Sequence, residues 1–231
     1  MNKIQYLLDN SNLPGPRGNL KLLYEFAEDA ADDEIDECLS YINPDVSNSP
    51  EEFVCMCGVL AYAVKHKDDT GRAAAFLREH ANHGSWRIRE AAAMGIQEIA
   101  GADTAALIDR LGDMINGTDL EKRAVVAGLC EPKLLGDEAA DIRILGILFE
   151  MTRALSRETR LNDGAKVLRK ALGYGWSVVI CSAPAEGKRL FEKAAALPGS
   201  PPRWIVRENL KKNRLAKLDP LWTASMKTKI S

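Results

Sequence analysis

The sequence lacks any segment of strand length in which apolar and polar residues alternate with period 2. It also lacks a run of about 18 apolar residues, the length that a membrane-spanning helix needs. The first ten residues, MNKIQYLLDN, have no apolar core of the kind found in signal peptides. These absences predict an all-α fold and a cytoplasmic protein without a membrane segment.

Cysteine and histidine are scarce, with five and three residues among 231. The cysteines are odd in number and mostly lie in apolar helical segments, which favours buried thiols in a reducing compartment. No group of Cys, His, Asp or Glu has the spacing of a metal site, and no nucleophile lies beside a base. We therefore expect no metal and no cofactor, and we favour a binding protein over an enzyme.

The segment from Ser85 to Ala100, SWRIREAAAMGIQEIA, has the clearest pattern in the chain. Its apolar residues have the spacing of one buried helix face: Ile88, Ala92, Gly95, Ile96 and Ile99. Ser85 precedes the helix in the position of an N-cap, and the small residues 91–95 allow a neighbouring helix to approach closely. The pattern predicts an amphipathic helix that needs other helices packed against it.

A similar pair of helices follows in the sequence. A shift of 33 places residues 122–129 over 89–96, and a shift of 34 places residues 107–115 over 73–81. A period of this length is typical of helical repeats. The segments RIREAAAMGI and EKRAVVAGL resemble the second helix of a HEAT repeat, and the resemblance extends over about residues 70–135.

The HEAT resemblance implies an α-solenoid of stacked helix pairs that forms a curved right-handed superhelix. We expect one domain over residues 1–231, with 219–231 a loosely held tail. The expected helices cover residues 3–8, 20–30, 33–42, 50–65, 69–82, 85–100, 103–116, 119–135, 137–156, 163–182, 184–197 and 203–215. The helix 50–65 is apolar enough to be central, and Gly173 and Gly175 predict a weak point in 163–182.

Charge is distributed unevenly along the chain. Residues 1–60 contain twelve acidic and three basic residues, whereas residues 200–231 contain eight basic and two acidic residues. Arg203, Arg207, Lys211 and Arg214 are spaced 4, 4 and 3 apart and are expected to form one basic ridge on the last helix. Such a ridge can follow a phosphate backbone. The alternative is that these cations are ordinary solvated residues or pair with the acidic N-terminal half.

The second helices of HEAT-like pairs line the concave face of the stack, where such proteins usually bind their partners. The candidate nucleic-acid or ligand-binding residues are therefore Trp86, Arg87, Arg89, Lys122, Arg123, Arg169, Arg203, Arg207 and Lys211. The tryptophans 86, 176 and 204 are candidates for stacking on bases, the alternative being that they fill the core. The expected partner is duplex DNA or another polyanion.

A second resemblance concerns Ser85 and Trp86. The HEAT-like DNA alkylation-repair glycosylases have a Ser-Trp-Trp-Asp segment beside the damaged nucleotide, and Ser85-Trp86-Arg87-Ile88 is similar to it. The resemblance implies a DNA glycosylase acting on alkylated bases. Ile88 replaces the expected carboxylate, however, and an aliphatic side chain does not stabilise a cationic sugar. A third hypothesis is a protein-protein adaptor whose acidic half meets a basic partner or a second copy of the chain.

Overall fold

The computed structural model describes residues 2–101 and 103–230. All regular elements in these residues are helices, which account for 74% of the chain and pack neighbour to neighbour. The predicted all-α, solenoid-like fold is thus confirmed. No helix in the described residues is both long enough and apolar enough to cross a membrane.

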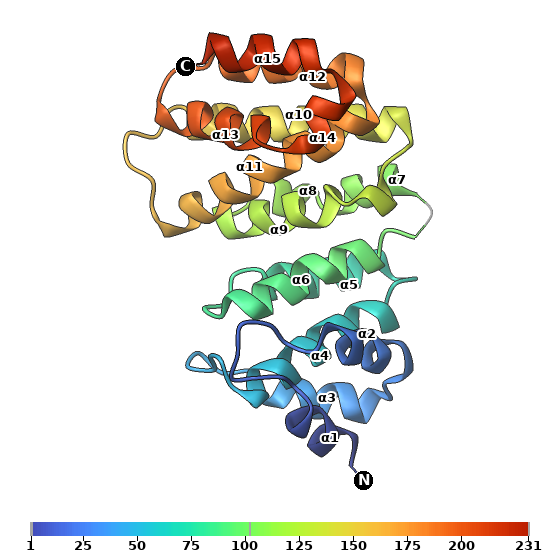
Figure 1. Cartoon of the computed structure of the whole chain (residues 1–231). Helices are drawn as coiled ribbons and strands as arrows, with labels where there is room; N and C mark the ends of the chain where they lie inside the picture. The colour runs from blue at the N-terminus through green and yellow to red at the C-terminus, as the bar shows by residue number, and fades with distance from the viewer. Residues whose placement is uncertain (1, 102, 231) are drawn as a thin grey trace. The chain divides into compact units, whose positions relative to one another are not determined.

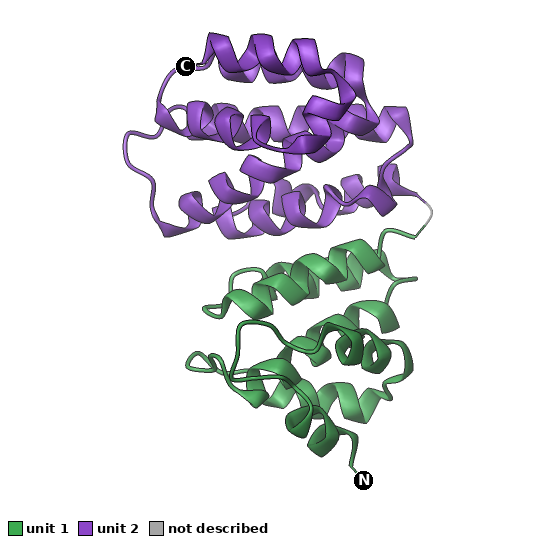
Figure 2. Ribbon diagram, in the orientation of Figure 1, with its two compact units in different colours: residues 1–102 green, residues 103–231 purple. Residues whose placement is uncertain are grey.

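The chain divides into two compact units, residues 1–102 and residues 103–231, which we call unit 1 and unit 2 (Figure 2). Each unit has its own central helix and its own buried core. The organisation as one HEAT-like domain stays a prediction, and each unit is described by itself.

The helices of unit 1 pack around α4 (Figure 1). They are α1 (Lys3–Asp9), α2 (Leu20–Asp29), α3 (Asp32–Ser40), α4 (Pro50–Lys65), α5 (Thr70–His80) and α6 (Trp86–Glu98). Every residue of α4 from Glu52 to Ala61 is buried, and α4 contacts all five other helices. An almost wholly apolar helix needs neighbours on every side, and the prediction of a central helix at 50–65 is confirmed.

Helix α6 lies close to α4 and α5 because its packed face is built of small residues. A Cβ atom on Gly95 would lie 2.6 Å from Cδ2 of Leu77 and 3.0 Å from Cβ of Ala63. The hydroxyl of Ser85 accepts hydrogen bonds from the backbone N–H groups of Arg87 and Ile88, at 3.1 and 3.2 Å. The predicted N-cap and the predicted close approach are both present.

The helices of unit 2 pack around α11. They are α7 (Thr104–Arg110), α8 (Gly112–Ile115), α9 (Asp119–Leu129), the 3-10 turn η1 (Pro132–Leu134), α10 (Glu138–Leu155), α11 (Asp163–Ser182), α12 (Pro184–Ala195), α13 (Ser200–Leu210), α14 (Asn213–Leu218) and α15 (Pro220–Lys229). Helix α11 contacts α9, α10, α12, α13 and α14 (Figure 1). Trp176 of α11 is fully buried, and its indole N–H donates to the Thr152 hydroxyl at 3.1 Å. Trp176 therefore belongs to the core and is not available for stacking.

Unit 2 differs from the expected helices at four places. The helix expected over 103–116 is interrupted at Leu111, and the one expected over 119–135 ends at Leu129, before Pro132. The helix expected over 203–215 is two helices, because α13 begins three residues earlier, at Ser200, and ends at Leu210. Pro201 and Pro202 fit the first turn of α13, where no backbone N–H is needed.

The fourth difference is the expected loose tail over 219–231, where the structure has helix α15. The Asp219 carboxylate accepts the N–H of Trp222 at 2.9 Å and pairs with Lys188 at 2.6 Å. Met226 of α15 is 1% exposed. A capped first turn and a buried methionine hold this helix on the unit.

Candidate nucleic-acid interface

The two units carry opposite net charge. Residues 1–102 contain 17 acidic and 9 basic residues, a balance of −8, whereas residues 103–231 contain 16 acidic and 22 basic residues, a balance of +6. The net charge of −2 for the whole chain is therefore the sum of two strongly charged halves of opposite sign. Only unit 2 has the sign that attracts a polyanion.

The positive charge of unit 2 is concentrated on α11, α13 and α14, together with Lys211 and Lys212 between α13 and α14. These elements contain nine cations and two carboxylates. Both carboxylates are used internally, since Asp163 pairs with Lys166 at 2.8 Å and Glu208 pairs with Lys211 at 2.5 Å. We call the following residues the basic face: Arg169, Lys170, Arg203, Arg207, Lys211, Lys212 and Arg214.

The close packing of α11 on α13 brings the two sides of the basic face together. The guanidinium carbon of Arg169 lies 4.5 Å from the centre of the Trp204 ring. The indole approaches α11 closely because residue 173 is glycine, where a Cβ would lie 2.8 Å from Cζ3 of Trp204. Arg169 is thus held over the seam between the two helices by a cation–π contact.

Tyr174 organises the other end of the basic face. Its side chain is exposed, and Lys212 and Arg214 lie over its ring at 5.6 and 4.7 Å from the centre. Arg214 also donates a hydrogen bond to the Tyr174 hydroxyl at 2.9 Å. Tyr174 was not among the predicted site residues, although its position four residues after Lys170 on α11 is a signal that sequence reasoning can use.

A buried asparagine fixes α13 against α11 beneath these cations. The Asn209 side chain is fully buried, and its Nδ2 donates to the carbonyls of Leu172 and Ile205 at 2.9 and 2.8 Å. Its Oδ1 accepts the backbone N–H of Ser177 at 2.8 Å. These bonds flank the glycines at 173 and 175, where a weak point was predicted, and α11 runs through them without a break.

The predicted basic ridge is present in part. Arg203 and Arg207 are exposed on α13 and lie one turn apart, and Lys211 follows at the C-cap. Arg214 is on the next helix, so the continuous spacing assumed for the ridge does not hold at its end. Arg207 also donates to the carbonyl of Ile230 at 3.4 Å.

Arg87 of unit 1 is not an exposed cation. Its side chain is 6% exposed and its Nη1 lies 2.9 Å from the Glu52 carboxylate, which is 1% exposed. Its Nη2 donates to the carbonyl of Gly15 at 2.6 Å. Arg87 therefore joins three segments of unit 1 through Nη1 and Nη2, and its burial removes it from the interface. Its Nε is buried without a hydrogen-bond partner among the described residues. No local pattern in the sequence indicates this pairing of Arg87 with Glu52, 35 residues away.

The other predicted residues belong to other elements than the basic face: Arg89 to α6 of unit 1, and Lys122 and Arg123 to α9 of unit 2. Arg89 is half-buried, and its Nη1 donates to the carbonyls of His83 and Gly84 at 2.6 and 2.7 Å. Burial lowers the pKa of the neighbouring His83, and the charges of His80 and Arg89 act in the same direction. Lys122 and Arg123 are half-buried on α9.

The residues that resemble the glycosylase segment have structural contacts. Trp86 is 52% exposed, with the guanidinium of Arg87 4.6 Å from its ring centre. Ile88 is fully buried in the core. The nearest carboxylate to Ser85 is Glu52, whose Oε1 accepts the Ser85 hydroxyl at 2.5 Å and whose Oε2 faces Arg87. This carboxylate is enclosed and already fully bonded.

Comparison with known proteins adds no identity. No protein-family model, curated protein or solved structure matches this chain. The geometry and charge of the basic face are the observations that bear on function.

Proposed function

We propose that this chain is a non-enzymatic binding protein that holds the phosphate backbone of a duplex nucleic acid on the basic face of unit 2. The observation that carries the proposal is the excess of nine cations over two carboxylates on α11, α13 and α14. Both carboxylates are paired within these elements, with Lys166 and with Lys211. The other seven cations, six of them on the basic face, have no carboxylate on these elements to neutralise them. Each phosphate that such a cation neutralises releases condensed counterions, which drives binding.

The aromatic residues favour contact with the backbone over stacking on bases. The ring of Trp204 has Arg169 over it, and the ring of Tyr174 has Lys212 and Arg214 over it. These rings hold the cations in place, and a base would have to displace a cation to stack on them. Recognition of this kind depends on the spacing of phosphates and is largely independent of sequence.

The test compares two charge-reversed variants of the full chain that alter net charge equally. Arg203→Glu/Arg207→Glu changes two exposed cations of the basic face, and Lys133→Glu/Lys193→Glu changes two exposed cations on η1 and α12. Fluorescence anisotropy with a labelled 20-base-pair duplex gives the dissociation constant of each. We expect the first variant to lose at least about tenfold in affinity, because it loses two phosphate contacts. Each lost contact should also lower the salt slope by about 1.

The control variant separates a specific face from general attraction. If the proposal holds, Lys133→Glu/Lys193→Glu weakens binding by less than about threefold, the loss that net charge alone produces through long-range attraction. Equal losses in the two variants would show that binding follows net charge and not the basic face. No loss in Arg203→Glu/Arg207→Glu would remove α13 from the interface.

A further inference from the structure

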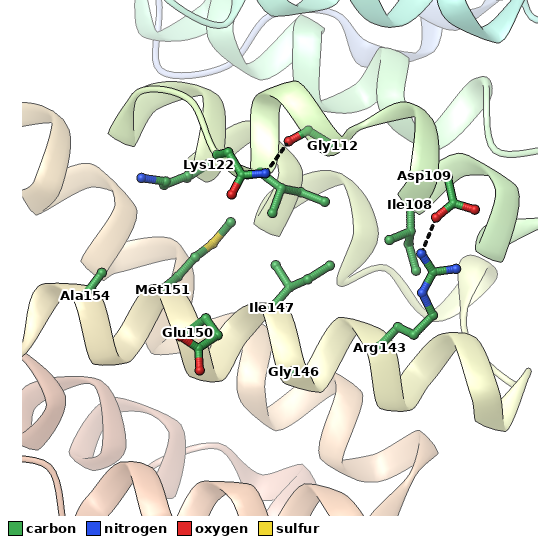
Figure 3. A pocket seen from close by; sticks show the side chains of 12 residues that line it. Ile108, Asp109, Gly112, Lys122, Arg143, Gly146, Ile147, Glu150, Met151 and Ala154 are labelled. Atoms are coloured by element: carbon green, nitrogen blue, oxygen red, sulfur yellow. Dashed lines mark hydrogen bonds and ion pairs between the residues drawn. The ribbon is translucent and has the colours of Figure 1, made fainter.

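A groove in unit 2 lies between α10 and the shorter helices α7, α8 and α9 (Figure 3). Its volume is about 650 Å³, which is within the usual range of sites for small molecules. It is separate from the basic face, since its lining residues come from α7 to α10, whereas the basic face lies on α11, α13, α14 and the two residues between the last pair. The inference drawn from it is independent of the proposed binding of nucleic acid.

One face of α10 forms the floor of the groove. The residues of this face recur at the spacing of one helix side: Arg143, Gly146, Ile147, Glu150, Met151 and Ala154. The other sides of α10 pack on α11, α12 and α13. Figure 3 shows Ile147 and Met151 pointing from α10 into the space below the opposite helices.

Two glycines keep the groove open. A Cβ atom on Gly146 or on Gly112 would meet no atom within 4 Å. Other helical glycines of this unit are needed for packing: a Cβ on Gly175 would lie 2.9 Å from Sγ of Cys130, and one on Gly187 would lie 2.9 Å from Cα of Ile180. Glycine in mid-helix is unfavourable relative to alanine. At Gly146 this cost has no packing reason, and the space that it leaves is the groove itself.

The groove combines apolar walls with paired charges at its rim. Ile108, Ile147 and Met151 contribute apolar surface. At one end Arg143 pairs with Asp109 and also donates to the carbonyl of Ala105 at 3.1 Å. Glu150 pairs with Arg153 along α10. These ion pairs leave the carboxylates of the rim neutralised.

Lys122 is the exception among the charged residues that line the groove. It is half-buried and makes no ion pair with any residue that the structure describes. In Figure 3 it lies near Met151 and Ala154, at the end opposite the Arg143–Asp109 pair. A lone ammonium group over apolar side chains matches a ligand with one negative charge and an apolar body.

We propose that this groove binds a small amphipathic carboxylate, with its carboxylate on Lys122 and its aliphatic body along Ile147 and Gly146. A single negative charge fits because Asp109, Arg143 and Glu150 are already paired, which leaves the ammonium group of Lys122 as the charge that a ligand would have to balance. The distance from Gly146 to Ala154 along α10 is about 12 Å at 1.5 Å per residue, which suits an extended chain of about eight carbons. The proposed ligand class is therefore the medium-chain fatty acids.

The experiment uses octanoate, octanol and octylamine as probes of the full-length protein in isothermal titration calorimetry. We expect octanoate to bind with the highest affinity of the three. Lys122→Met should lower the affinity for octanoate about tenfold, which corresponds to the loss of one charge-assisted contact. The affinity for octanol should stay unchanged. Lys133→Met, which changes an exposed lysine on η1, should leave octanoate binding unchanged.

A second variant tests the groove directly. Gly146→Leu should abolish octanoate binding and raise the melting temperature, because the side chain enters open space and a helix glycine is removed. Ala224→Leu, on an exposed position of α15, should leave octanoate binding unchanged. Either equal affinity for the three probes or unchanged octanoate binding in Gly146→Leu overturns the proposal. Failure of octanoate to bind the unaltered protein also overturns it. If octanoate fails to bind and sedimentation shows a dimer that Gly146→Leu abolishes, the occupant of the groove is a second copy of the chain.

Discussion

Replacing Arg87 with methionine should destabilise unit 1 far more than the loss of a surface cation. The Glu52 carboxylate accepts hydrogen bonds from Ser85 Oγ, the Asn48 N–H and Arg87 Nη1, at 2.5, 2.7 and 2.9 Å. Its side chain is 1% exposed, so the Arg87→Met change leaves a negative charge in the core without a counterion. Removing one partner of a buried pair costs about 3 to 5 kcal/mol.

The measurement is urea-induced unfolding followed by far-UV circular dichroism. Hydrogen exchange of the α4 and α6 amides assigns the loss to unit 1. The control is Lys21→Met, which removes an ion pair with Glu25 at 3.4 Å in which both side chains are exposed. Its effect should be at most about 0.5 kcal/mol.

A second variant isolates the stranded charge as the cause. Adding Glu52→Gln to Arg87→Met replaces the buried carboxylate with a neutral amide of similar shape, and should restore more than about 1 kcal/mol of the free energy of unfolding. A loss in Arg87→Met of less than about 1 kcal/mol, or no recovery in the double variant, would refute the account of this pair.

Two further predictions concern buried polar groups and thiols. Asn209→Ala should lower the free energy of unfolding by about 3 kcal/mol, because it removes the side-chain partner of the Ser177 N–H and the Leu172 carbonyl in a buried seam; a loss below about 1 kcal/mol in urea unfolding would contradict this. Burial raises the pKa of Cys38 and of Cys55 to about 12, so at pH 8 only about one molecule in ten thousand carries either thiolate. Iodoacetamide at pH 8 should therefore modify the half-buried Cys181 first, as read by peptide mass spectrometry, and equal modification of Cys38 in the folded protein would show that the thiol is not enclosed.

Helical periodicity predicts most of the fold because it depends on residues three and four apart. The spacing around Ile88 and Gly95 identifies α6, and the continuous apolar composition of residues 52–61 identifies α4 as central. The break at Leu111 has only the following Gly112 as a local signal. The position of helix α15 depends on the ion pair between Asp219 and Lys188, which lies 31 residues earlier in the chain. A local sequence pattern does not reveal a contact over this separation.

The candidate site is predictable only in part for the same reason. Arg203 and Arg207 are exposed as their spacing predicts. Arg87 has the same charge and a comparable helical setting, yet it is buried because Glu52 lies opposite it. Tyr174 and its two cations are joined across about 40 residues by the contact of α11 with α14. Local sequence patterns indicate which residues are charged, and tertiary contacts decide which of those charges remain at the surface.

The salt dependence of duplex binding tests the central claim most directly. Anisotropy titrations of the full chain at about 50, 100 and 200 mM salt give the slope of log affinity against log salt, which is about −0.9 for each phosphate neutralised on duplex DNA. Contact with at least four phosphates through the basic face predicts a slope steeper than about −3.5. The slope should become about two units shallower in Arg203→Glu/Arg207→Glu. A slope near zero, or no binding at the lowest salt, would contradict the account.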